Sequence, residues 1–160
     1  MIERDILSIT RGAIVHQVNC RKKAGAGLAR QIREAYPLWY KRYRETEPHM
    51  GLVDFYGATP RLVIVSLYAQ EDYGRCKGVV YTNYDALAWC LRQVRLWFSP
   101  KVPVYIPYGI GCGLAGGDWR IVSRIINKEI PNAILVKKPE KGEVCGSEST
   151  RDVSSILRLE

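Results

Sequence analysis

Two glycine-rich segments carry the residue types best suited to holding an anion. The first runs from Val18 to Arg30 (VNCRKKAGAGLAR) and the second from Pro107 to Trp119 (PYGIGCGLAGGDW). Each follows an apolar run typical of a strand and precedes a helical pattern. Glycine lets the backbone approach a ligand closely, and the free amides at a helix start attract negative charge. Two such loops at one sheet edge could hold two phosphates, or a diphosphate and its sugar.

The second segment contains the spacing G-x-G-x-x-G at Gly111, Gly113 and Gly116. A dinucleotide-binding fingerprint of that form should open the first strand–helix–strand unit of a fold. Here one helix and one strand follow it, which argues against that fold. Tight turns with helix caps would explain two or three glycines, but residues 109–117 hold five in nine positions.

Polar residues at the ends of these loops have two interpretations each. Asn19 ends a buried strand, where its amide needs a partner, either ligand hydroxyls or the neighbouring loop. Asp118 precedes a helical pattern, so it either caps that helix or faces a ligand sugar. We therefore retain both as candidate catalytic residues.

Metal and disulfide chemistry are not expected. The cysteines are Cys20, Cys76, Cys90, Cys112 and Cys145, an odd count with no C-x-x-C pair. His16 and His49 show no zinc-ligand spacing with them. No metal or cofactor is predicted. The net charge of +8 instead suits an anionic partner such as a nucleotide, a diphosphate or nucleic acid, although charge also keeps proteins in solution.

The elements that position these loops alternate along the chain. Strands are predicted at residues 13–18, 62–67, 102–106 and 133–136, and shorter ones nearer an edge at residues 5–9 and 52–56. Helices are predicted from Gly27, with a kink or break at Pro37, after Thr82 or Asn83, and from Asp118. This order predicts an α/β protein with three α/β/α layers and a mixed central sheet.

The length of 160 residues predicts one domain, over residues 1–138. Residues 139–160 are polar and without clear periodicity for most of their length, which predicts a C-terminal tail. No run of eighteen apolar residues and no apolar leader segment is present, so a cytoplasmic location and no membrane association are expected.

The two loops together resemble those of macro domains. Ile14 to Cys20 (IVHQVNC) precedes a G-x-G helix start, and Tyr105 to Trp119 reads YIPYGIGCGLAGGDW. The resemblance covers residues 2–137 and is greatest to a divergent branch of small phage and bacterial macro proteins. That branch is related to the yeast ADP-ribose 1''-phosphate phosphatase and to terminal ADP-ribose glutamate hydrolases. It implies a macro domain fold and ADP-ribose, or a derivative, as the ligand.

The resemblance also implies roles for particular positions. Asp5, with Ile6 beside it, matches the aspartate that contacts the adenine amine, and Asn19 matches the asparagine near the distal ribose. Tyr68 and Gln70 would border the ribose. The two diphosphate loops would be Gly25, Ala26, Gly27 and Leu28, and then Ile110, Gly111, Cys112, Gly113, Leu114, Ala115 and Gly116.

Four alternative functions follow as expectations. The first is hydrolysis of a distal-ribose derivative such as ADP-ribose 1''-phosphate, with Asp118 or a held water in proton transfer. The second is removal of ADP-ribose from protein or nucleic acid, and the third is binding without turnover, as a reader or sponge. The lysine and aspartate of the glutamate hydrolases are replaced here by residues 68–70 and by Ala115, which disfavours their mechanism. Lys22, Lys23 and Lys77 could stand near the ligand, and nucleic-acid binding through Arg21, Lys22 and Lys23 is a fourth alternative.

Overall fold

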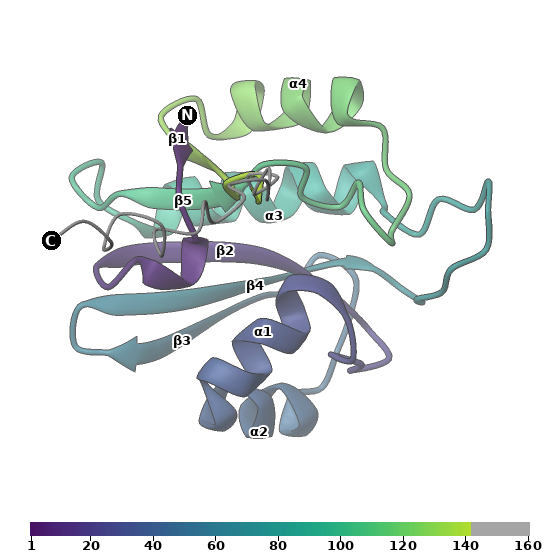
Figure 1. Cartoon of the computed structure of the whole chain (residues 1–160), viewed down its shortest axis with the longest axis horizontal. Coiled ribbons are helices and arrows are strands. Elements are labelled where there is room, and N and C mark those ends of the chain that lie inside the picture. Colours follow the sequence, from purple (N-terminus) through teal and green to yellow (C-terminus); the bar gives the residue numbers. More distant parts are fainter. Residues whose placement is uncertain (142–160) are drawn as a thin grey trace, which may run out of the picture.

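The computed structural model describes residues 1–141, which form a mixed sheet between two helical layers (Figure 1). The strands are β1 (Ile2–Glu3), β2 (Gly12–Asn19), β3 (Val53–Thr59), β4 (Leu62–Gln70), β5 (Val104–Pro107) and β6 (Ile134–Lys137). The helices are α1 (Gly27–Ala35), α2 (Pro37–Glu45), α3 (Tyr84–Trp97), α4 (Trp119–Glu129) and the short 3-10 helix η1 (Ile6–Ser8). The predicted three-layer α/β/α architecture is confirmed.

The sheet order is β1-β6-β5-β2-β4-β3, and only the β3–β4 pair among these strands is antiparallel. The central strand β2 is apolar along most of its length because both of its faces are covered. Helices α1 and α2 cover one face, and α3 and α4 cover the other (Figure 1). Each interface holds its own buried cluster of aliphatic and aromatic side chains.

The helix boundaries follow the predicted signals. The first helical segment divides at Pro37, which occupies the first turn of α2, since a residue before proline disfavours the helical conformation. Asn83 caps α3 by accepting a hydrogen bond from the Ala86 amide at 2.9 Å. Asp118 caps α4 in the same manner through the Arg120 amide at 2.9 Å.

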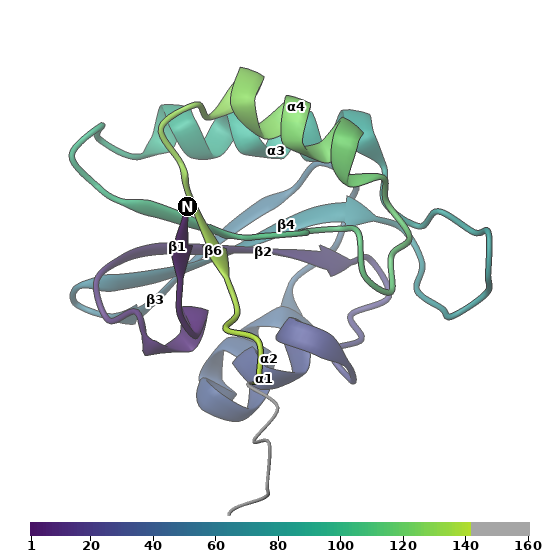
Figure 2. The same ribbon diagram turned by 45° about the horizontal axis from the view of Figure 1, so that its top comes forward.

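The strand predicted at residues 5–9 is wrong, because this segment forms η1. The Asp5 carboxylate accepts a hydrogen bond from the Leu7 amide at 2.9 Å, and the Ser8 hydroxyl donates to the Asp5 carbonyl. Such local side-chain bonds offer the backbone an alternative to a sheet ladder. The two-residue β1 takes the edge position instead, pairing in parallel with β6 (Figure 2).

Candidate functional site

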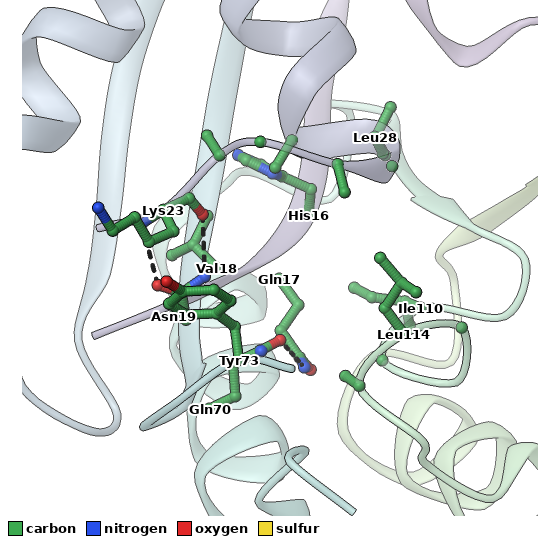
Figure 3. A pocket seen from close by; sticks show the side chains of 18 of the residues that line it. His16, Gln17, Val18, Asn19, Lys23, Leu28, Gln70, Tyr73, Ile110 and Leu114 are labelled. Atoms are coloured by element: carbon green, nitrogen blue, oxygen red, sulfur yellow. Dashed lines mark hydrogen bonds between the residues drawn. The ribbon is translucent and has the colours of Figure 1, made fainter. Parts of the chain in front are cut away.

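A cleft of about 900 Å³ opens at the carboxyl ends of β2, β4 and β5. The chain leaves β2 toward α1 on one face of the sheet, and leaves β5 toward α4 on the other. Neighbouring strands whose connections diverge in this way leave a crevice between the loops, which is the usual ligand position in open α/β sheets. Both glycine-rich loops line this cleft, as the sequence predicted (Figure 3).

The first loop is shaped by Asn19. Its side-chain amide donates to the Lys23 carbonyl at 2.9 Å, and its side-chain oxygen accepts from the Lys23 amide at 3.1 Å. The Tyr43 hydroxyl donates to the Asn19 carbonyl at 2.8 Å. Of the two partners considered for this buried amide, the neighbouring loop is therefore the one in place (Figure 3).

The second loop depends on glycine at two close approaches. A Cβ atom on Gly111 would lie 2.8 Å from the Gln17 side-chain oxygen and 2.9 Å from the Thr82 hydroxyl. A Cβ atom on Gly116 would lie 2.5 Å from the Val79 carbonyl. Both glycines also have φ of +71°, in the region that favours glycine. The loop is thus held against its neighbours by its own backbone.

A chain of hydrogen bonds joins the second loop to the sheet. The Gln17 side-chain amide donates to Gln70 Oε1 and to Thr82 Oγ1, each at 2.9 Å. The Thr82 hydroxyl in turn donates to the Gly111 carbonyl at 2.6 Å. Gln17, on β2, therefore positions the end of β4 and the second loop together.

The charged side chains that line the cleft, among the described residues, are all positive. Lys23, Arg33 and Arg75 line it, and no aspartate or glutamate of the described chain does. Several residues of the two loops that line the cleft also have backbone amides without a partner among the described residues. Those of Gly25, Ala26, Gly113, Leu114 and Ala115 find no acceptor within residues 1–141. The cleft consequently combines unpaired donors with positive charge, which suits a phosphate-bearing ligand.

His16 forms part of the cleft wall and is 1% exposed. Its Nε2 lies 3.1 Å from the Ser66 hydroxyl, which also accepts a hydrogen bond from the Trp39 indole at 3.0 Å. Burial lowers the pKa of His16 from 6.5 to about 3, so the ring is neutral near physiological pH. An imidazole with such a pKa is a poor general base at that pH.

The structure brings many of the predicted site residues together. Those that line the cleft are Asn19, Gly25, Ala26, Gly27, Leu28, Gln70, Ile110, Gly111, Gly113, Leu114 and Ala115. Those that do not line it are Asp5, Ile6, Tyr68, Cys112, Gly116 and Asp118. Lys23 lines the cleft, whereas Lys22 donates from its ammonium group to the Arg44 carbonyl and Lys77 borders a separate hollow of about 310 Å³.

Three of the residues outside the cleft have pKa values shifted by their local surroundings. The Asp118 carboxylate accepts hydrogen bonds from the Arg120 side chain at 2.9 and 3.2 Å, which lower the pKa of Asp118. Tyr68 is fully buried, and burial raises its pKa. Burial likewise raises the pKa of the Cys112 thiol. None of these three residues lines the cleft.

The sequence did not single out several residues that line the cleft. These are Gln17, Arg33, Tyr40, Tyr73, Gly74, Arg75 and Tyr108. The segment after β4 could have been predicted from the sequence, because Tyr73, Gly74 and Arg75 follow a strand that ends beside Asn19. Arg33 and Tyr40 lie on α1 and α2, and only the packing of these helices brings them to the cleft.

Within residues 1–141, no three histidine, cysteine, aspartate or glutamate side chains cluster as metal ligands would. The helices of this same region are all too short or too polar to cross a membrane.

Comparisons with known proteins give structural likenesses. A Bacteroides thetaiotaomicron structure of a protein of unknown function is 31% identical, with a TM-score of 0.70, over 86% of this chain and 96% of that one. The macrodomain of Mycobacterium tuberculosis DarG is 22% identical, with a TM-score of 0.64, over 87% and 98%. Thermosipho africanus DarTG in complex with ADP-ribose is 16% identical, with a TM-score of 0.65, over 81% and 38%. No protein-family model and no curated protein matches the chain.

Proposed function

This chain has the macrodomain fold, and from that premise we propose that its cleft binds ADP-ribose or a close derivative. The observation that carries the proposal is the charge and donor pattern of the cleft. Lys23, Arg33 and Arg75 line it without any carboxylate of the described residues, and loop residues whose amides have no acceptor within residues 1–141 line the same space. A diphosphate is the part of ADP-ribose that such a site recognises.

The first loop would hold one phosphate through the amides of Gly25 and Ala26, ahead of the start of α1. The second loop would hold the other through the amides of residues 113–115. A DarTG structure of the same fold was solved in complex with ADP-ribose, which supports this ligand class. Asp5 remains our proposal for the adenine contact, although it lies outside the cleft and its carboxylate holds the Leu7 amide.

The geometry favours binding without turnover over hydrolysis. The Asn19 amide is occupied by the Lys23 backbone, and Asp118 is held by Arg120 outside the cleft. Ala115 stands in the cleft where the resemblance would require an aspartate. Hydrolysis of ADP-ribose 1''-phosphate, or removal of ADP-ribose from protein or nucleic acid, would need a proton carrier other than these groups.

The test is titration calorimetry with ADP-ribose, for which we expect a micromolar or tighter Kd at one site. The matched variant is Gly25→Glu, because Gly25 lines the cleft, has no positive φ and has open space where a Cβ would lie. The added carboxylate should repel the diphosphate and abolish measurable binding. Gly27→Glu is a weaker choice, since Gly27 has φ of +58° and a side chain there strains the backbone.

Absence of heat at millimolar ADP-ribose would refute the proposal. Turnover is measured separately, as phosphate released from ADP-ribose 1''-phosphate. Release at the rate of buffer alone is the result we expect. Faster release would reinstate the phosphatase function.

A further inference from the structure

Positive charge is concentrated in one stretch of the chain. Residues 20–45, which form the first loop, α1 and α2, hold eight lysine and arginine side chains against two glutamates. Their net charge is +6, out of +8 for the whole chain. Residues 84–129, which include α3 and α4, hold six against three, a net charge of +3 over a longer stretch. The stretch that forms α1 and α2 therefore carries the denser positive charge.

Only part of this charge is neutralised by ion pairs. Arg30 pairs with Glu34 at 3.0 Å, Arg42 with Asp54 at 2.7 Å, and Arg21 with Asp72 at 3.7 Å. The remaining five cations have no carboxylate within ion-pair distance in residues 1–141. They are Lys22, Lys23, Arg33, Lys41 and Arg44.

Several of these cations are joined into a row. The Lys22 ammonium donates to the Arg44 carbonyl at 2.8 Å. The Arg44 guanidinium lies 5.9 Å from the centre of the Tyr40 ring, and the Arg33 guanidinium lies 5.3 Å from it. We call Lys22, Arg44, Tyr40 and Arg33, with Lys41 on the same helix as Arg44, the basic row. Arg33 and Tyr40 line the cleft, whereas Lys22, Lys41 and Arg44 lie beyond it.

Two exposed tyrosines line the same cleft as Arg33 and Tyr40 of the basic row. Tyr73 and Tyr108 line the cleft and are 50% and 44% exposed. The Lys137 ammonium lies 6.0 Å from the Tyr108 ring centre, and Arg75 follows Tyr73 by two positions. A cationic track with aromatic rings beside it is the arrangement that single-stranded nucleic acid uses, through its phosphates and its stacked bases.

We infer that the basic row binds single-stranded nucleic acid, whose backbone follows the α1–α2 face to the mouth of the cleft. ADP-ribose within the cleft leaves Lys22, Lys41 and Arg44 unused, because these residues do not line it. A chain of phosphates uses them, since each lysine or arginine on such a track neutralises about one phosphate. The inference does not depend on ADP-ribose binding.

The test measures fluorescence anisotropy of a labelled oligothymidylate of about 20 nucleotides. The test variant is Lys41→Gln/Arg44→Gln, and the matched control is Arg124→Gln/Lys128→Gln on α4, which removes two exposed cations from the opposite face. We expect the test variant to bind roughly fivefold or more weakly and to reduce the slope of log affinity against log salt by about 1.4. The control variant should bind like the unmodified protein.

The thermal unfolding midpoint of Lys41→Gln/Arg44→Gln should stay unchanged, which shows that its fold is intact. The inference fails if the unmodified protein does not bind the oligonucleotide at about 50 mM salt. It also fails if the test and control variants lose affinity equally. Equal competition by polyglutamate would assign the basic row to an acidic protein and overturn nucleic acid as its partner.

Discussion

Asn19 and Asp118 are polar residues for which the sequence allowed a ligand contact, yet both are engaged by nearby groups. The Asn19 amide bonds twice to the Lys23 backbone, and the Asp118 carboxylate holds the amide and side chain of Arg120. A polar side chain at such a position can either hold its own loop through hydrogen bonds or form hydrogen bonds to a ligand. Sequence therefore identified these residues without distinguishing their roles.

For Asp118 we expect a structural role. Asp118→Ala should lower the free energy of unfolding by about 1 kcal/mol through loss of the α4 cap. Asp118→Asn retains a capping oxygen, so its stability should stay close to that of the unmodified protein. Both variants should bind ADP-ribose normally, because Asp118 does not line the cleft. Urea unfolding and calorimetry provide the two measurements. A large loss of affinity in Asp118→Asn at normal stability would show instead that this carboxylate acts on the ligand.

His16 should make stability depend on pH. Its pKa in the folded chain is about 3, below the ordinary value of 6.5. As pH falls below that ordinary value, the unfolded chain gains a proton that the folded chain does not accept until near its own pKa, so stability decreases through this window. From about pH 7 to pH 5 the unmodified protein should lose about 2 kcal/mol more than His16→Gln does. Urea unfolding at the two pH values measures the difference. Parallel losses in both proteins would contradict this assignment.

The helices and strands were largely predictable because their signals are local. Period-two and apolar runs placed β2, β4 and the later strands, and Pro37, Asn83 and Asp118 marked helix starts. The segment at residues 5–9 was not predictable in this way, since the bonds that Asp5 makes outweigh its apolar pattern. The two glycine-rich loops of the cleft were also predictable, because glycines between a strand and a helix are a local signal. Arg33 and Tyr40 were missed because tertiary packing alone brings them to the cleft.

The second loop should tolerate a side chain at one glycine and not at another. Gly116→Ala places a Cβ 2.5 Å from the Val79 carbonyl at a φ of +71°. We expect it to cost about 1–3 kcal/mol of unfolding free energy. The matched variant is Gly113→Ala, where nothing lies within 4 Å of the new atom and φ is not positive. Its effect should stay within about 0.5 kcal/mol. Thermal unfolding compares the two, and equal midpoints would mean that the loop rearranges to accept Gly116→Ala.

In the whole molecule, the two helical layers differ in packing and in charge. The sheet and the α3–α4 layer form one apolar cluster, and the α1–α2 layer forms the other while carrying most of the net charge. Both glycine-rich loops start from the central strands β2 and β5, so this part of the cleft is fixed to the middle of the sheet. Ligand contacts and surface charge can thus vary without changes to the core.

The predicted tail, residues 139–160, lies outside the described residues from position 142 onward, so the domain boundary remains a prediction. Every strand and helix described here ends by Lys137, and the last residue of either buried cluster is Val136. Strand β6 is already paired on both sides, with β5 and β1.

Because stability in a domain of this size comes mainly from burial of such clusters, a chain that ends at Lys141 should unfold at the same temperature as the full chain. It should also bind ADP-ribose with the same affinity, because the described residues that line the cleft lie between His16 and Ala115. Differential scanning calorimetry and a ligand titration on both chains make the comparison. A lower midpoint in the shorter chain would show that the tail packs on the domain, and weaker binding at an unchanged midpoint would show that it contributes to the ligand site.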